Sequence, residues 1–521
     1  MEPETIRKIV MGSKATNCLS DPIPSKFIKD NVDIVLPLIV KITNISLLTG
    51  KFSEEWKTAF VLPLLKKIGM ELINKSYRPV SNLSFLSKIV EKSGLVQFVD
   101  YMDENHLQPN YLSAYRKYFS TETALMKLHN DILTHLDDKM MVLMTMIDLS
   151  AAFDTVDHDI LLDVMDENYA VKGLAYNWFD TYLRPRNFKT FVNDAVSEPK
   201  KLPFSVPQGS CAGPVLYNVY ASTLENLFKE SKQKVLGYAD DHSFYDSFDI
   251  TTYDSVKASM ENKLDEVKQW MTSNRLKMND EKTEVIIFGS NYYLSKLDKE
   301  AIRVGYDNIE VSEVVKYLGA WLDSKMTMSR FITEKCKSAH FHLHNIRQMR
   351  RSIDMERCKT LVHSLIISQF DYANALLYGL PDYEIEKLYR IQCSAAKLIL
   401  NRHRRCSNDK ALFDLHWLPI SYRIKHKILC MVYKCLHNEA PEYLSSLLEY
   451  KKTDYQTRTE DNLDLVVPKT TNSYGDRSFR VCGPKLWNST PTVIRKSETF
   501  DIFKNNIKTY LFREAFPDLV D

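Results

Sequence analysis

One stretch near the middle of the chain decides the fold: Val235-Leu236-Gly237-Tyr238-Ala239-Asp240-Asp241-His242-Ser243-Phe244-Tyr245. Apolar residues on both sides of two carboxylates predict two short strands joined by a two-residue turn, Asp240-Asp241. Two like charges between apolar flanks repel each other, and the repulsion is costly unless a cation offsets it. The stretch therefore predicts a β-hairpin with carboxylates at its tip; ordinary turn residues are the competing interpretation.

A second acidic residue, Asp148, follows an apolar run. Residues 140–147 read Met-Met-Val-Leu-Met-Thr-Met-Ile, which is typical of a strand buried on both faces. Strand ends hold carboxylates rigidly, so Asp148 and Asp240 are expected to meet, although a helix N-cap is the competing interpretation of Asp148. Two such carboxylates can share a pair of divalent cations, and Mg²⁺ is expected because a hard cation prefers oxygen ligands. This chemistry suits nucleotidyl transfer.

The rest of the chain alternates helical and strand patterns. Strands are predicted at residues 60–65, 190–192 and 284–288. Helices are predicted at residues 25–48, 83–104, 158–169, 174–183, 214–227 and 254–272, and again after residue 330. Residues 203–213 and 453–480 are predicted to be loops because they are rich in Pro and Gly or in polar residues.

Composition excludes several classes of protein. The 521 residues are 44% hydrophobic and 26% charged, which excludes collagen-like and wholly disordered chains. The best membrane candidate, residues 34–40, contains Pro37 and is ended by Lys41, so no membrane helix is predicted. Nine irregularly spaced Cys and a non-secretory N-terminus favour reduced thiols inside a cell. Net charge is +2, but residues 330–450 hold 19 basic and 12 acidic residues, an excess that suits a polyanion.

Three motifs, in this order, resemble those of reverse transcriptases. Asp148-Leu149-Ser150-Ala151-Ala152-Phe153-Asp154 resembles the family motif DLSxAFD, Pro207-Gln208-Gly209-Ser210 resembles the PQGS loop, and Tyr238-Ala239-Asp240-Asp241 resembles the [YF]xDD signature. The motif sequences most resemble those of jockey-like non-LTR retrotransposons, with further similarity at residues 77–81, 120–125 and 316–319. The resemblance is strong over about residues 23–322 and continues more weakly through His416-Trp417-Leu418-Pro419.

The resemblance implies an α+β right-hand polymerase with fingers, palm and thumb and a mostly helical C-terminal region. The expected parts are an N-terminal extension and fingers at residues 1–139, a palm at 140–325 with a fingers insertion near 160–205, a thumb and helical basic region at 326–450, and a tail region at 451–521. The implied activity is RNA-directed DNA synthesis by two-metal nucleotidyl transfer.

The resemblance also implies the catalytic residues. Asp148, Asp240 and Asp241 are expected to be catalytic and to bind two Mg²⁺ ions, with Mn²⁺ as a substitute, and the backbone oxygen of Leu149 is expected to join the metal shell. Lys282 matches the lysine proposed to protonate the leaving pyrophosphate. A plain surface lysine is the competing interpretation of Lys282.

Substrate positions follow in the same way. Lys66 and Arg78 match residues that contact the triphosphate, and solvated surface cations are the competing interpretation. Phe153 matches the aromatic position that excludes a 2′-hydroxyl, because an apolar ring offers the hydroxyl neither space nor a hydrogen-bond partner. Gln208 and Gly209 are expected to line the nascent base pair and the template backbone.

The remaining nucleic-acid contacts are expected later in the chain. Tyr317, Leu318 and Gly319 resemble the primer-grip turn, for which a plain hairpin is the competing interpretation. Basic clusters at Arg347, Arg350 and Arg351 and at Arg402, Arg404 and Arg405 suit phosphates, and solvated helix faces explain them equally well. The implied partners are an RNA template, a DNA primer and dNTPs, with no membrane; the sequence does not indicate an oligomeric state. The resemblance alone implies residence in the nucleus.

Departures from the family pattern favour a rival interpretation. Where the family reads GFRKGxST, this chain has Ala114-Tyr115-Arg116-Lys117-Tyr118-Phe119-Ser120-Thr121, so side chains replace both glycines. No endonuclease domain is expected before the first polymerase-like helix. The rival is a catalytically silent nucleic-acid-binding remnant or domesticated copy of such an element. An RNA-dependent RNA polymerase is a third hypothesis, against which Phe153 predicts a preference for dNTPs.

Overall fold

The computed structural model describes residues 1–150, 152–193, 195–279, 282–305, 307–403, 405–451 and 463–519. The chain divides into two compact units that interleave along the sequence. Unit 1 comprises Met1–Tyr115, Ile147–His242 and Asn262–Lys282, and unit 2 comprises Arg116–Met146, Ser243–Glu261 and Thr283–Asp521. The division into fingers, palm, thumb and tail stays a prediction.

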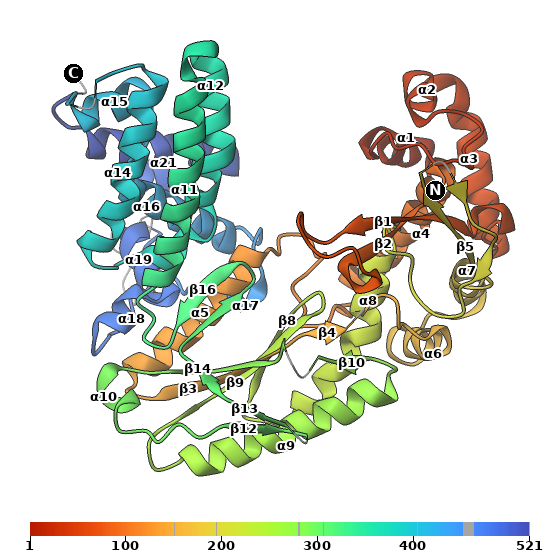
Figure 1. The fold of residues 1–521 in the computed structure, drawn as a ribbon, viewed down its shortest axis with the longest axis horizontal. Coiled ribbons are helices and arrows are strands. Elements are labelled where there is room, and N and C mark those ends of the chain that lie inside the picture. Colours follow the sequence, from red (N-terminus) through yellow and green to blue (C-terminus); the bar gives the residue numbers. More distant parts are fainter. Residues whose placement is uncertain are drawn as a thin grey trace. The chain divides into compact units, whose positions relative to one another are not determined.

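Unit 1 begins with a helical cluster (Figure 1). Its helices are α1 (Pro3–Gly12), α2 (Ser25–Asp30), α3 (Val32–Thr49), α4 (Phe85–Glu104), α6 (His158–Tyr169), α7 (Gly173–Leu183) and α8 (Gly213–Ala221). Buried apolar side chains of the first four, among them Ile6, Val32, Ile39 and Ile89, form one core. The predicted helix at 214–227 changes at Ser222 into the 3₁₀-helix η3 (Ser222–Phe228).

Helix α3 corrects the sequence-based expectation about membrane helices. Pro37 lies inside the helix without ending it, and the 18 residues have a mean hydropathy of 1.7, with 22% of them buried. By length and composition alone, α3 is therefore long and apolar enough to cross a bilayer. Core helices of globular proteins and signal sequences share these properties.

The first sheet of unit 1 has the order β2-β1-β5-β6, with β7 also paired to β5. Its strands are β1 (Thr58–Leu65), β2 (Tyr77–Asn82), β5 (Asn187–Val192), β6 (Ala195–Val196) and β7 (Lys200–Lys201). The β1–β2 pair is antiparallel and sets Arg78 opposite Leu64, whereas β1 and β5 run parallel. The strands predicted at 60–65 and 190–192 are thus present, and each begins earlier than expected.

The sheet that carries the predicted acids has the order β14-β11-β3-β9-β8. Its strands are β3 (Met141–Ile147), β8 (Lys234–Tyr238), β9 (Asp241–Phe248), β11 (Glu284–Phe288) and β14 (Val311–Ser312). Every residue of β3 is buried, as its unbroken apolar run predicts. The predicted turn was wrong by one position: Ala239 and Asp240 form it, with Ala239 at φ +57°, and Asp241 already begins β9.

Unit 2 is chiefly helical after β15 (Val314–Tyr317) and β16 (Ala320–Asp323), and its helices form the group labelled α11 to α21 in Figure 1. The longer helices are α5 (Thr121–Asp137), α11 (Ser329–Met349), α12 (Met355–Val362), α14 (Asp382–Ile399), α16 (Ile420–Leu436), α19 (Phe479–Ser489) and α21 (Phe500–Ala515). The loop predicted at 453–480 was partly wrong, because α18 (Ser473–Arg477) and the start of α19 lie within it; residues 452–462 are outside the described part.

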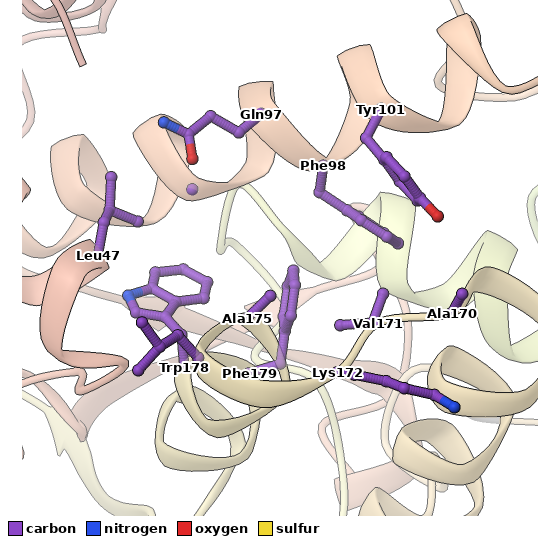
Figure 2. Close-up of a pocket in the computed structure, with 12 residues that line it drawn as sticks. Leu47, Gln97, Phe98, Tyr101, Ala170, Val171, Lys172, Ala175, Trp178 and Phe179 are labelled. Carbon is purple, nitrogen blue, oxygen red and sulfur yellow. The ribbon is translucent and has the colours of Figure 1, made fainter.

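An apolar pocket of about 310 Å³ lies between α4 and α7 of unit 1. Figure 2 shows Phe98 of α4 and Phe179 of α7 on facing sides, and their ring centroids are 5.2 Å apart. A Cβ at Gly94 would lie 2.8 Å from the Trp178 ring, so glycine lets the two helices approach. None of the predicted site residues lines this pocket.

Candidate active site

Asp148 lies just beyond β3 and is held by a short strand pair. Strand β4 (Leu149–Ser150) pairs with β10 (Lys277–Met278), which brings Asn279 and Lys282 to Asp148. The backbone N–H of Asn279 donates to the Asp148 carbonyl at 2.9 Å. The Asp148 Oδ2 accepts from Lys282 Nζ at 3.0 Å and from Asn279 Nδ2 at 3.3 Å. Asp148 is therefore paired with the lysine that was expected to act on pyrophosphate.

Asp240 and Asp241 have raised pKa values with shared causes. Burial raises the pKa of Asp240, the nearby Asp148 charge raises it further, and Arg78 and Lys282 lower it. Burial, followed by the charges of Asp240 and Asp148, raises the pKa of Asp241 to about 6. The three carboxylates therefore act on one another electrostatically, as two strand ends that meet would require.

The donor set suits a hard divalent cation. It consists of carboxylate oxygens whose mutual repulsion a cation would relieve, together with the carbonyl of Leu149, which directly follows Asp148 in β4. Within the described residues, no group of three or more His, Cys, Asp or Glu forms a ready-made metal site. The Lys282 ammonium and the Asn279 amide occupy Asp148 instead.

Phe153 packs on a residue that the sequence reasoning missed, Tyr217 of α8. The two rings are stacked with centroids 4.9 Å apart, and the Phe153 carbonyl accepts from Val206 N–H at 3.1 Å. Tyr217 is fully buried, and its hydroxyl has no hydrogen-bond partner among the described protein atoms. Burial, with the charges of Asp240 and Asp241 adding to it, raises the Tyr217 pKa well above 10. Its position just after the PQGS-like loop was the available signal.

The loop that holds Gln208 and Gly209 is fixed against β2. Ser81 N–H donates to the Gln208 carbonyl at 2.7 Å. Gly209 has φ +117°, and a Cβ there would lie 2.6 Å from the Ser81 carbonyl oxygen. Only glycine fits this conformation and this approach. The loop is thus attached to the strand that carries Arg78.

Glu91 of α4 is a second residue that the sequence reasoning missed. It is fully buried, and its Oε1 accepts from the Ala212 N–H at 2.7 Å and from the Tyr182 hydroxyl at 2.8 Å. Burial raises its pKa, and those hydrogen bonds and the Arg186 charge lower it. Glu91 therefore anchors the end of the PQGS-like loop where α8 begins. Glu91 is one of four acidic residues in α4, so no sequence signal sets it apart.

The two predicted triphosphate contacts lie near different acids. Arg78 is exposed on β2, and its charge lowers the pKa of Asp240. Lys66 donates to the Lys75 carbonyl at 2.8 Å, and its charge lowers the pKa of Asp154, which burial raises. The structure therefore brings Arg78 toward the acidic cluster and places Lys66 toward Asp154.

Tyr317, Leu318 and Gly319 form the hairpin between β15 and β16, within unit 2. Leu318 and Gly319 both have positive φ, +45° and +82°. The Tyr372 hydroxyl donates to the Leu318 carbonyl, and the Tyr317 and Ser243 hydroxyls are 3.1 Å apart. The hairpin itself is confirmed, and its contact with a primer stays a prediction.

The basic clusters proposed for phosphate contact have mixed surroundings. The Arg350 guanidinium donates to the carbonyls of Ile353, Leu398 and Ile399, so it links the end of α11 to the end of α14. Arg402 pairs with Asp414, and Arg404 lies outside the described residues. Arg347 and Arg351 are exposed and remain candidates, as does Arg405.

At the second replaced glycine, Tyr118, the backbone keeps the glycine-like conformation. Tyr118 has φ +69°, a left-handed value that costs a residue with a side chain more than glycine. Ala114, at the first position, is fully buried, and its carbonyl accepts from Asn218 Nδ2 at 2.8 Å. The chain thus accommodates a side chain at both positions.

Comparisons with known proteins agree with this geometry. Residues 65–322 match the family model for reverse transcriptase (RNA-dependent DNA polymerase). Two Drosophila melanogaster proteins are similar: the probable RNA-directed DNA polymerase from transposon BS, 27% identical over 69% of this chain, and the RNA-directed DNA polymerase from mobile element jockey, 28% identical over 71%. The chain spans 39% of the length of each.

A likeness to solved structures is weaker. Apo telomerase from Candida tropicalis, truncated of its C-terminal domain, aligns over 52% of this chain and 54% of its own length. The sequence identity is 12% and the TM-score is 0.36. The family match, by contrast, covers all three motifs, and the fold class is that of a right-hand polymerase. Residues 65–322 therefore belong to the reverse transcriptase family by their match, and the chain is similar in sequence to the polymerases of transposon BS and mobile element jockey.

Proposed function

We propose that this chain is an RNA-directed DNA polymerase that extends a DNA primer on an RNA template by adding dNTPs to the primer 3′-hydroxyl. One observation carries the proposal: beyond the effect of burial, the Asp148 charge raises the pKa of both Asp240 and Asp241, and Arg78 and Lys282 are close enough to lower that of Asp240. Carboxylates of this kind at strand ends, beside cations, suit the transfer of a nucleotidyl group. The activity named for the relatives supports the same reaction.

The carboxylates of Asp148, Asp240 and Asp241 and the carbonyl of Leu149 are the proposed ligands for two Mg²⁺ ions, with Mn²⁺ as a substitute. When bound, such ions lower the pKa of the attacking hydroxyl and neutralise charge on the phosphoryl oxygens. The Lys282 ammonium, bound to Oδ2 of Asp148, is proposed to compete with the ions for this carboxylate. Lys282 is then free to hold a proton near the leaving pyrophosphate.

Other residues of the chain position the substrates. The Arg78 fork is proposed to grip the triphosphate, with Lys66 as a second point charge. The Phe153 ring, supported from behind by Tyr217, is proposed to exclude a 2′-hydroxyl. Gln208 and Gly209, fixed to Ser81, are proposed to line the nascent base pair. The hairpin at Tyr317, Leu318 and Gly319 is proposed to hold the primer.

A primer-extension assay tests the proposal. With poly(rA)/oligo(dT) and Mg²⁺, the chain is expected to incorporate dTTP, to stop when EDTA removes the metal, and to use UTP about 10- to 100-fold less well. No incorporation of either nucleotide would favour the silent remnant, and a preference for UTP would favour an RNA polymerase. Residence in the nucleus is a further proposal, and imaging of a tagged chain tests it.

A further inference from the structure

We propose that a cavity built wholly from unit 2 binds a short stretch of single-stranded nucleic acid. The cavity has a volume of about 880 Å³, in the range of sites that hold a few nucleotide-sized groups. Its walls come from the start of α5, from α12, from the segment before α16, and from α16 and α21. Binding at this cavity does not require that the chain incorporates dNTPs.

Two motifs that the polymerase reaction leaves without a role meet at this cavity. Ser120, Glu122 and Thr123 belong to the first, and His416, Trp417 and Leu418 belong to the second, almost 300 positions later; all six line the cavity. The capping box at Ser120 and Thr123 fixes the start of α5, where Glu122 binds Lys427 of α16 at 2.9 Å. The fold therefore brings the two motifs, which are far apart in the sequence, to one cavity.

The charge of the lining favours an anion. Lys359, Lys434, Lys504 and Lys508 line the cavity, and no ion pair with a carboxylate involves them among the described residues. Two of the three acids on the lining are already neutralised, since Asp371 binds Arg423 and Glu122 binds Lys427. Phosphates of a nucleic acid backbone are the anions that such spaced lysines suit.

The spacing shows that the lysines belong to one site. On α21, Phe500, Lys504 and Lys508 recur every four residues, so one helical face carries them. On α16, Arg423, Lys427 and Lys434 form the corresponding face, and the two helices pack together. The charges of Lys504 and Lys508, with that of Arg423, add to burial in lowering the His426 pKa to about 4, so this ring is neutral at pH 7.

Two buried polar groups on the lining have no partner. The Trp417 Nε1–H donor and the Asn374 Oδ1 acceptor lack hydrogen bonds to any described protein atom, although both side chains are at least 97% buried. Such groups are costly unless something else satisfies them. A nucleobase edge offers both an acceptor and a donor, which a simple polyanion does not.

Aromatic rings supply surfaces on which bases stack. Tyr118, half exposed, lies on the lining with Phe500 and the exposed His416, whereas Trp417 is buried and offers no open ring face. Lys434 lies over the Phe500 ring at 4.4 Å, the combination of cation and ring that single-strand sites use. Tyr118 keeps its ring here at the cost of a left-handed backbone, in the position where the family has glycine. A duplex is too wide for this volume, so the occupant is single-stranded.

Anisotropy with a fluorescein-labelled RNA of about 12 nucleotides, and with the DNA of the same sequence, tests the site on the full chain without metal or dNTP. The double variant Lys504→Ala/Lys508→Ala is expected to bind RNA, DNA or both about tenfold more weakly. The slope of log K against log salt is expected to fall by about 1.4, or 0.7 per phosphate contact. The matched control is Lys325→Ala/Lys410→Ala, which removes two exposed cations of unit 2 that lie outside the cavity and have no proposed role in binding.

Cross-linking with 4-thiouridine in the same RNA locates the contact. Adducts are expected on peptides that contain Trp417, Phe500 or Tyr118, and Asp240→Asn is expected to leave them unchanged because it acts only on the polymerase site. The proposal is overturned if adducts avoid these peptides, if the control pair loses binding while Lys504→Ala/Lys508→Ala does not, or if an acidic peptide of equal charge displaces the RNA from these peptides as well as unlabelled RNA does.

Discussion

The Lys282 ammonium lies 3.0 Å from the Asp148 Oδ2, with the Asn279 amide also donating to the same oxygen at 3.3 Å. A cation of the chain itself thus occupies a carboxylate that the proposed reaction needs for a metal. Lys282 is two-thirds exposed, so the pair opens at low cost. We therefore expect a bound metal ion and the Lys282 ammonium to compete for Asp148.

Replacing Lys282 separates these two effects. Lys282→Ala is expected to lower the Mg²⁺ concentration for half-maximal extension several-fold, because the competing ammonium is gone. The maximal rate is expected to fall by about 10²-fold, because the proton donor is lost. A Mg²⁺ titration of primer extension measures both. Lys277→Ala, on the adjacent strand β10, is the control, and equal behaviour of the two variants would remove Lys282 from the mechanism.

The acid at the start of β9 makes stability depend on pH. The Asp241 pKa is raised from 3.8 to about 6, so the folded chain binds this proton more tightly than the unfolded chain. The resulting stabilisation is complete below the unfolded pKa and is lost as pH rises through about 6. Asp241→Asn is expected to raise the thermal midpoint at pH 7.5 and to leave it nearly unchanged at pH 4. Thermal unfolding at the two pH values measures this. A lower midpoint of Asp241→Asn at pH 7.5 would contradict the raised pKa of Asp241.

A divalent ion is expected to act in the same pH window. Added Mg²⁺ should raise the midpoint of the wild-type chain above pH 6 and have little effect well below it, because protonated Asp241 no longer offers a charged ligand. Asp241→Asn should shrink the rise. Ca²⁺ in place of Mg²⁺ checks whether the effect needs only charge.

Gly209 is expected to tolerate no side chain. Gly209→Ala puts a Cβ 2.6 Å from the Ser81 carbonyl at φ +117°, so the loop must leave β2. Extension is expected to fall by about 10²-fold, because a displaced substrate wall misaligns the reacting groups. Gly12→Ala is the control, since that Cβ meets nothing within 4 Å. Comparable activity of the two variants would show that the loop does not line the substrate.

Phe153 sets the choice between sugars. Phe153→Val is expected to raise the use of UTP relative to dTTP by about 10- to 100-fold, because the smaller side chain leaves room for the 2′-hydroxyl. Phe204→Val, an exposed loop residue, is the control. Tyr217→Phe tests the support: it keeps the ring that stacks on Phe153 and is expected to preserve discrimination. Unchanged discrimination between UTP and dTTP in Phe153→Val would contradict the assignment of Phe153 as the residue that excludes the 2′-hydroxyl.

Much of the fold followed from local patterns. The unbroken apolar run at 140–147 predicts β3, and the helical pattern at 158–169 predicts α6, which the structure shows to be capped by Asp157. The hairpin of Asp240 was found one residue out of register, because a positive φ at Ala239 is not visible in the residue type. The interruption expected at Pro37 does not occur: Pro37 is the sixth residue of α3, and the helix continues to Thr49 although proline lacks the N–H that would bond within the helix.

The candidate site was less predictable where contacts join distant segments. The motifs supplied Asp148, Asp240, Arg78 and Phe153, but nothing local to Lys282 indicates an ion pair with a residue 134 positions away. Tyr217 and Glu91 were missed because neither an aromatic residue in α8 nor one of four acids in α4 has a distinguishing pattern. Their roles come from contacts with distant segments, since Glu91 accepts from the Ala212 N–H and Tyr217 stacks on Phe153.

The central claim is that Asp148, Asp240 and Asp241 jointly hold the ions that drive nucleotidyl transfer. Primer extension by Asp240→Asn on poly(rA)/oligo(dT) with Mg²⁺ tests it most directly, with Asp254→Asn, an exposed acid on α9 (Tyr253–Ser273), as the matched control. We expect Asp240→Asn to lose extension by about 10³-fold or more while its thermal midpoint stays at or above that of the wild type. Extension at the wild-type rate by Asp240→Asn would contradict the assignment of the metal site.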